Sequence, residues 1–212
     1  VPHYRQSLSV TCGPASLLMA MTTLDRRTIV NRAEELDLYR EMTTISYPTD
    51  NGHGGCLPQS LALAAVRRGF NAELHMDWRK GEPYPVNVRT PKSRDRVEVW
   101  RLMWDRDMSR SIKEGVRHSR EWPGLKGIEA RFDEGWLPIV HVNCKYLHDE
   151  NEGHFVVITG FDDQSFYIND PWVAVTKGKT AADMTNRGVP RREFDRIARF
   201  AIRRWRAVVI LR

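Results

Sequence analysis

Residues 6–21 read QSLSVTCGPASLLMAM, and the interpretation of the whole chain starts from this stretch. Cys12 is followed by Gly-Pro and then by an apolar run, which predicts that a loop becomes a helix at this point. Pro14 suits the first helical turn, where its missing N–H removes no hydrogen bond. The positive end of the helix favours the thiolate of Cys12, which is the reactive form of cysteine. Gln6 lies six residues upstream, where its side-chain amide can fold back beside the sulfur.

A cysteine beside an apolar helix is more often a small buried hydrophobe, so a nucleophile also requires a base and a group that orients it. Residues 153–161 predict a buried strand, and residues 165–169 predict a returning strand that ends at an Asp-Pro turn. In this hairpin His154 comes level with Asp170 to within one or two residues. The carboxylate can then hold the imidazole by its Nδ1–H and leave Nε2 to face the thiol.

Each of these residues also has a structural interpretation, since histidines at strand starts and Asp-Pro turns are common. The agreement of Cys12, His154 and Asp170 in order and spacing leads us to predict a Cys-His-Asp triad. His141, on a strand predicted over 137–143, is a second base candidate. It lacks a paired acid at a following strand end, so we assign it a structural role.

Together, Gln-x5-Cys-Gly-Pro, Gly-His-Phe-Val-Val-Ile on a strand and Asp-Pro after the next strand resemble the C39-like cysteine peptidases. The resemblance covers residues 1 to about 172. It implies an α+β papain-like fold, in which an N-terminal helix carrying the nucleophile packs on an antiparallel sheet carrying His and Asp. It also implies that Cys12 is the nucleophile, His154 the base, Asp170 the orienting acid and Gln6 an oxyanion-hole donor.

The best-known members of that family cut bacteriocin-type leader peptides and usually precede a transporter. This chain has no apolar stretch near the ~18 to 20 residues that span a bilayer, so it resembles a stand-alone, soluble branch. We expect a single domain over residues 1–212, with an elaborated helical insertion at about residues 78–122. The predicted helices cover 13–24, 28–42, 57–68, 96–118 and 126–135, and further core strands are predicted at 72–76 and 205–212.

A second cysteine, Cys56, also precedes a predicted helix and forms the main rival site. His53 lies three residues before it, but zinc sites require about four ligands and the chain contains no CxxC pair. We therefore expect no metal and no cofactor. Because glycine allows another chain to approach closely, we expect His53, Gly54 and Gly55 to contact the substrate backbone beside the cleft.

The composition fits one soluble enzyme domain, with 212 residues, 41% hydrophobic and 28% charged. Three cysteines predict no disulfide framework and favour a reducing compartment, which we take to be the cytoplasm.

The net charge of +6 is concentrated in residues 187–212, which carry +7 while the remaining residues carry −1. Such a patch can bind RNA or an acidic substrate, but we interpret it as a solvated face and expect no nucleic acid. Residues 177–180, KGKT, lack the first glycine of a phosphate loop, so we expect no nucleotide.

These observations predict a cysteine peptidase or amidohydrolase that acts on a peptide or protein substrate, with a leader or Gly-rich peptide among the candidates. Two alternatives stay open. One is a thiol transpeptidase of the phytochelatin-synthase type, which passes the acyl group to an amine. The other is a non-catalytic peptide-binding module, although C39-like binding modules commonly lack the cysteine. The sequence leaves the oligomeric state open.

Overall fold

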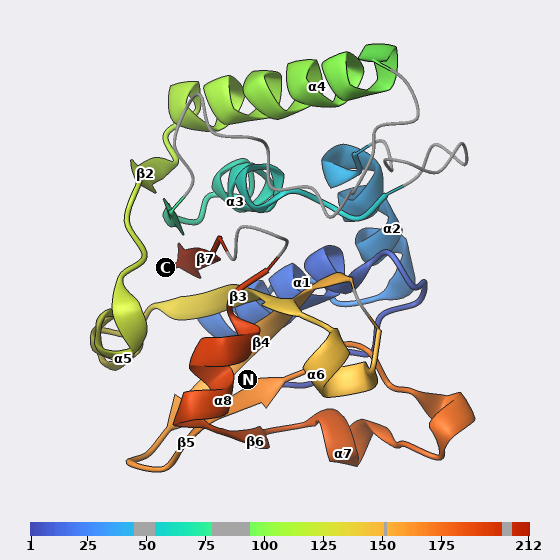
Figure 1. Cartoon of the computed structure of the whole chain (residues 1–212), viewed down its shortest axis with the longest axis vertical. Coiled ribbons are helices and arrows are strands. Elements are labelled where there is room, and N and C mark those ends of the chain that lie inside the picture. Colours follow the sequence, from blue (N-terminus) through green and yellow to red (C-terminus); the bar gives the residue numbers. More distant parts are fainter. Residues whose placement is uncertain (45–53, 78–93, 151, 201–204) are drawn as a thin grey trace.

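The computed structural model describes residues 1–44, 54–77, 94–150, 152–200 and 205–212 (Figure 1). His53 lies outside the described residues, as do residues 78–93 of the predicted insertion. The strands form one sheet of order β2-β1-β7-β3-β4-β5-β6, in which β1 and β2 are parallel and all other pairs are antiparallel. A mainly antiparallel sheet combined with helices confirms the predicted α+β class.

The bounds of the elements are as follows. The strands are β1 (Ala72–Met76), β2 (Arg117–Ser119), β3 (Leu137–Asn143), β4 (Gly153–Phe161), β5 (Ser165–Asn169), β6 (Arg187–Pro190) and β7 (Ala207–Leu211). The helices are α1 (Cys12–Leu24), α2 (Arg32–Met42), α3 (Pro58–Val66), α4 (Arg94–Lys113), α5 (Gly124–Asp133), α6 (Lys145–His148), α7 (Ala181–Met184) and α8 (Arg191–Ile197), with a 3-10 turn at Val175–Lys177.

Two predicted helices differ from the structure by four or more residues at one end, and both differences have a local cause. Helix α2 begins four residues later than predicted because Asn31 is its N-cap, accepting a hydrogen bond from the backbone N–H of Glu34 at 2.9 Å. Helix α4 ends five residues earlier than predicted because Gly115 has φ +101° and the chain then enters β2, which pairs with β1. Of the helices described, none is both long and apolar enough to cross a bilayer.

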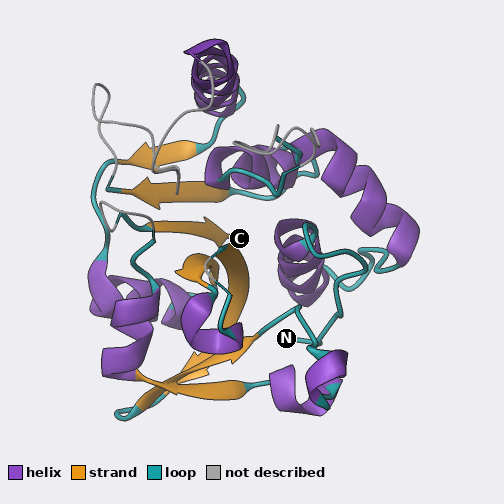
Figure 2. Cartoon of the chain, turned by 45° about the vertical axis from the view of Figure 1, so that its right-hand side comes forward, coloured by secondary structure: helices purple, strands orange, loops and turns teal. Residues whose placement is uncertain are grey.

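Two hydrophobic cores lie on opposite faces of the sheet (Figure 2). On β4, Phe155 and Val157 face the core that contains α1 and α3, whereas Val156 and Ile158 face the core that contains α8. Helix α4 covers α3 from outside, so it forms a further layer on the α1 side (Figure 1). Residues 12–21 of α1 are all buried, which explains why this helix is apolar on every side.

The predicted hairpin of β4 and β5 is present. Val157 pairs with Asn169 and Ile158 with Ile168, with an irregularity before Gly160. Continuing this register past the end of β5 sets Asp170 opposite Val156, two residues from His154. The two side chains therefore point to the same face of the sheet as diagonal neighbours, within the range that the prediction allowed.

Candidate active site

Cys12 is the first residue of α1 and is almost fully buried, at 6% exposure. Thr11, the N-cap residue, makes no side-chain cap bond to the helix, and the first turn contains no acidic residue. The amide groups of this turn and the positive end of the helix are therefore left to act on a negative charge at or near the sulfur. An α1 hydroxyl fixes the helix to the sheet, since Ser16 Oγ donates to the carbonyl oxygen of Phe155 at 3.0 Å.

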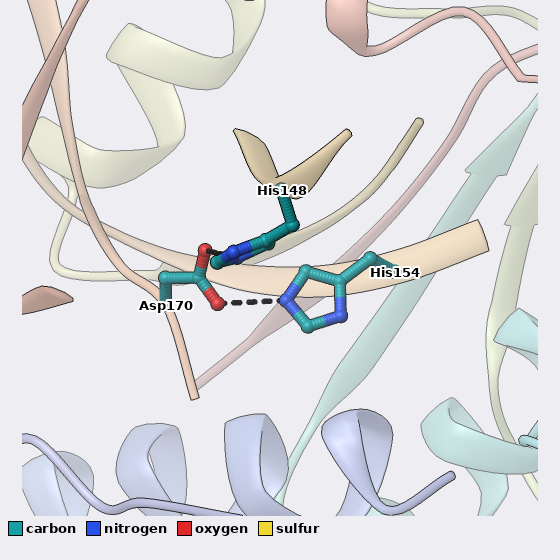
Figure 3. A group of neighbouring side chains, drawn as sticks. All are labelled: His148, His154 and Asp170. Atoms are coloured by element: carbon teal, nitrogen blue, oxygen red, sulfur yellow. Dashed lines mark hydrogen bonds and ion pairs between the residues drawn. The ribbon is translucent and has the colours of Figure 1, made fainter. Parts of the chain in front are cut away.

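His154 and Asp170 form a direct hydrogen bond, with 2.7 Å between Nε2 of His154 and Oδ1 of Asp170 (Figure 3). The expectation that the acid would hold Nδ1 is wrong, because the carboxylate binds Nε2. The ring therefore turns Nδ1 away from the carboxylate and leaves it free of Asp170, while Cys12 lies near enough to the ring to contribute to the raised pKa of His154. The structure thus brings Cys12, His154 and Asp170 together.

The electrostatics of this group favour an ion pair. Burial alone would lower the pKa of His154, but the charge of Asp170, its hydrogen bond and the interaction with Cys12 outweigh burial and raise the pKa to about 10. For Asp170, burial alone would raise the pKa, but the charge of His154 and the hydrogen bonds from the two histidines hold it well below its usual range. The arrangement therefore stabilises an imidazolium that carries a proton beside the sulfur.

A second histidine, His148, binds the other oxygen of the same carboxylate. Its Nε2 lies 2.7 Å from Oδ2 of Asp170, and its side chain is buried (Figure 3). His148 ends α6, where its N–H donates to the carbonyl oxygen of Cys144 at 2.8 Å and its own carbonyl oxygen accepts from Nζ of Lys177 at 2.6 Å. Sequence reasoning missed His148, because it lies in no motif and no strand pairing places it beside Asp170.

Gln6 is buried beside the turn that follows Asp170. Its backbone N–H donates to the carbonyl oxygen of Pro171 at 3.0 Å, and its Nε2 donates to the carbonyl oxygen of Leu8 at 2.6 Å. Among the described residues, its buried Oε1 has no hydrogen-bond partner. One of the two amide hydrogens is therefore occupied by Leu8, and the second is left for another acceptor.

The segment that carries Gln6 is held by Glu35, a fully buried carboxylate on α2 that sequence reasoning also missed. Glu35 accepts from the hydroxyl of Tyr4 at 2.8 Å and from the N–H and Oγ of Ser7 at 2.7 and 2.5 Å. Burial and this carboxylate raise the pKa of Tyr4 to about 12. These bonds bridge the residues on both sides of Gln6, so they fix the path of the chain at that position.

Cys56 lies against the start of α1 rather than in a site of its own. A Cβ added at Gly13 would lie 2.1 Å from Sγ of Cys56, so the sulfur occupies the space that the missing side chain leaves. Burial, with a smaller contribution from Cys12, raises the pKa of the Cys56 thiol well above its usual value. Gly54 accepts a hydrogen bond from the hydroxyl of Tyr39 at 3.1 Å, and it lies with Gly55 beside the end of α2.

His141 is packed among aromatic rings, in keeping with the structural role assigned to it. It stacks on Trp205 with ring centroids 5.1 Å apart, and it meets Phe155 and Phe200 edge-on. Burial lowers its pKa to about 3. The ring is therefore neutral and makes no hydrogen bond to Asp170.

The ligand atoms of His148, His154 and Asp170 lie within 4.8 Å of one another, so this group could be considered for a metal ion. Both N···O distances are 2.7 Å, however, which is a hydrogen-bond distance. Ligands of a tetrahedral zinc ion lie about 3.3 Å apart when each is ~2.0 Å from the metal. The observed geometry fits a hydrogen-bonded acid between two imidazoles better than a metal centre.

Comparisons with known proteins bear on the family and the fold of the chain. A family model described as "Peptidase_C39 like family" matches residues 1–212. A putative C39-like peptidase from Bacillus anthracis aligns over 100% of this chain and 94% of its own, with a TM-score of 0.55 and 14% identity. At this identity the likeness concerns the fold alone, and it confirms the predicted papain-like α+β fold. A double glycine motif protease from an AMS/PCAT transporter, solved with its leader peptide, aligns over 100% of this chain and 90% of its own at 20% identity, with a TM-score of 0.44.

One curated protein also matches part of the chain. It is the subtilisin-like serine protease Cur l 4.0101 of Cochliobolus lunatus, which is 26% identical over 118 residues. The match covers 55% of this chain and spans only 22% of that relative.

Proposed function

The chain belongs to the Peptidase_C39-like family, and from this membership and the geometry of the site we propose that it is a cysteine peptidase or amidohydrolase. The observation that carries the proposal is the position of His154, between the carboxylate of Asp170 and the thiol at the start of α1. A nucleophile, a base and an orienting acid in this order are the parts that thiol acyl transfer requires.

In the proposed reaction, the thiolate of Cys12 attacks the carbonyl carbon of a peptide or amide bond. The oxyanion of the tetrahedral intermediate accepts hydrogen bonds from the N–H of Cys12 and from the free amide hydrogen of Gln6. His154 then donates its Nδ1 proton to the leaving amine as the C–N bond breaks and a thioester forms. Water, deprotonated by His154, attacks the thioester and releases the acid, which returns the thiol to its starting state. Asp170 keeps the ring oriented throughout and stabilises its charge.

We propose a peptide or protein as the substrate, held in part by backbone contacts at Gly54 and Gly55. Both glycines lie next to Cys56, whose sulfur packs against α1 directly beside the proposed nucleophile. The absence of side chains at these two positions allows an extended peptide to approach the backbone closely.

The test uses Cys12→Ala with Cys56→Ala as the matched control, in a peptide-library cleavage assay read by mass spectrometry. We expect Cys12→Ala to abolish turnover and Cys56→Ala to retain it. Asp170→Asn should lower kcat by several orders of magnitude, about 10⁴-fold in a comparable triad. Full activity in Cys12→Ala contradicts the mechanism, and loss of activity in Cys56→Ala alone would move the nucleophile to Cys56.

The same assay separates the transpeptidase and binding-module alternatives. With an added amine acceptor, a transpeptidase gives a ligated product, whereas a peptidase gives the free acid. A binding module retains bound peptide and yields neither product.

A further inference from the structure

The carboxylate of Asp170 is held at both of its oxygens by different elements. Oδ1 receives Nε2 of His154 from β4 and, at 2.9 Å, the backbone N–H of Trp172. Oδ2 receives Nε2 of His148 from α6. The two imidazole rings lie 5.8 Å apart and nearly perpendicular, at 83° (Figure 3).

Rotation about the Cβ–Cγ bond moves both carboxylate oxygens together, so the two bonds to Oδ1 and the bond to Oδ2 resist the same rotation. The donor at Oδ2 comes from another element and adds a third hydrogen bond to those that keep Oδ1 facing His154. A buried carboxylate also requires donors in order to remain ionised, since burial disfavours the charged form. Among the described residues, His148 supplies the one side-chain or backbone bond to Oδ2.

We infer that His148 is a positioning residue that locks the orientation of Asp170, so that Asp170 in turn holds His154 with Nδ1 toward Cys12. The inference rests on the proposed function, because it assigns His148 a part in the same thiol chemistry. His148 touches neither the sulfur nor a substrate, and it acts through Asp170 alone.

The surroundings of His148 support this role. Its backbone is fixed on both sides, by the bonds to Cys144 and Lys177, so the ring has a defined position from which to meet Oδ2. A buried polar side chain is unfavourable unless it is hydrogen-bonded, and an apolar residue would fill the same space in α6 without that requirement. The bond to Asp170 is the interaction that a histidine provides here and an apolar side chain does not.

His148 also lines a cavity whose lining includes neither Asp170 nor His154. The cavity has a volume of about 400 Å³, and its other lining residues include Lys145, Lys177, Lys179 and Arg187. It provides a route by which a small molecule can reach the position of a truncated His148 side chain. Imidazole added to His148→Ala can therefore replace the missing ring.

The experiment measures the rate at which iodoacetamide alkylates Cys12 at neutral pH, with the labelled cysteine identified by mass spectrometry. His148→Leu removes the donor, and we expect labelling to slow by about tenfold, the effect of losing one charge-assisted hydrogen bond. His148→Gln retains an N–H donor of similar reach and should label within about threefold of wild type. His148→Ala should label slowly, and added imidazole should restore its labelling rate. His118, a half-buried histidine bonded to Ser111, provides the control. His118→Ala should label at the wild-type rate, and added imidazole should not change that rate.

Wild-type labelling in His148→Leu overturns the inference, and so does a folded His148→Gln that labels as slowly as His148→Leu. If His148→Leu fails to fold, His148→Ala decides the question, because slow labelling that imidazole restores supports the inference and wild-type labelling overturns it. The labelling assay needs no peptide turnover. If wild type cleaves no peptide but labelling depends on His148 as described, the peptidase proposal fails and the inference stands. If wild type cleaves peptides and the labelling rate does not depend on His148, the peptidase proposal stands and the inference about His148 fails.

Discussion

At the scale of single residues, the chemistry of the site depends on which atom of a side chain meets which partner. The order of Cys12, His154 and Asp170 along the chain and the local hairpin predict that these residues lie close together. They do not predict that Nε2 of His154 faces the acid, because ring orientation is set by side chains that pack around the site from distant elements. His148 was missed for the same reason, since its bond to Asp170 joins α6 to the end of β5.

The ion pair of His154 and Asp170 should make stability depend on pH. The pKa of His154 rises from 6.5 to about 10 on folding, so its stabilising contribution is complete below about pH 6.5 and is lost as pH rises toward 10. We expect the free energy of unfolding, measured in urea at pH 7 and pH 9.5, to be lower at the higher pH. In His154→Gln this decrease should be smaller, and an equal decrease would contradict the assignment.

The contact between Cys56 and Gly13 predicts a pair of compensating substitutions. Gly13→Ala places a methyl group where the sulfur lies, and overpacking of this kind costs about 1–3 kcal/mol. Cys56→Ala removes the sulfur and should restore most of the lost stability when combined with Gly13→Ala. Thermal unfolding of the single and double variants measures the coupling, and strictly additive effects would show that the contact is absent in solution.

At the scale of elements, the segment carrying Gln6 is fixed by α2 through Glu35. Glu35→Ala leaves the hydroxyl of Tyr4 and the N–H and Oγ of Ser7 without their acceptor. A fully buried unsatisfied donor costs about 1–3 kcal/mol, and these half-buried donors cost less. We expect a lower melting temperature and a reduced kcat, because Gln6 is no longer held in place. Asp37→Ala, an exposed neighbour on the same helix, is the control and should change neither quantity.

The elements differ in how far the sequence predicts them. Helix α1 and the β4–β5 hairpin depend on local signals, namely Gly-Pro before an apolar run and two β-branched runs around a turn, and both are present. The predicted end of α4 at residue 118 is wrong because residues 117–119 form β2, a strand of three residues that pairs with β1. A short strand has too few residues to show a pattern, so its existence depends on tertiary contacts.

At the scale of the whole molecule, α4 shares a core with α1. Its Trp100 and Trp104 are buried with ring centroids 5.1 Å apart, and Trp104 meets Trp205 at 6.4 Å. We propose that residues 78–122 form an insertion within one domain, and we expect a single cooperative unfolding transition. Tryptophan fluorescence and far-UV circular dichroism should give coincident curves, and an earlier fluorescence transition would indicate a separately folding unit.

The basic C-terminal region is partly neutralised in the folded chain. Arg191 pairs with Glu129, Arg196 with Glu193, and Arg199 and Arg206 both pair with Asp195. These contacts favour the interpretation as a solvated face. Weak, salt-independent binding or no binding to RNA at low salt remains the expected result.

The burial of residues 12–21 of α1 makes the position of the sulfur independent of the surface around the site. The proposed nucleophile begins a helix whose next nine residues are packed inside the protein, so its position is set by the interior and not by the surface around it. Exposed loops that make no contact with Cys12, His154 or Asp170 can therefore change composition without moving the sulfur. Preference for a substrate can diverge among relatives of this chain while the reacting group keeps its place, and grafting such loops is the natural way to redirect it.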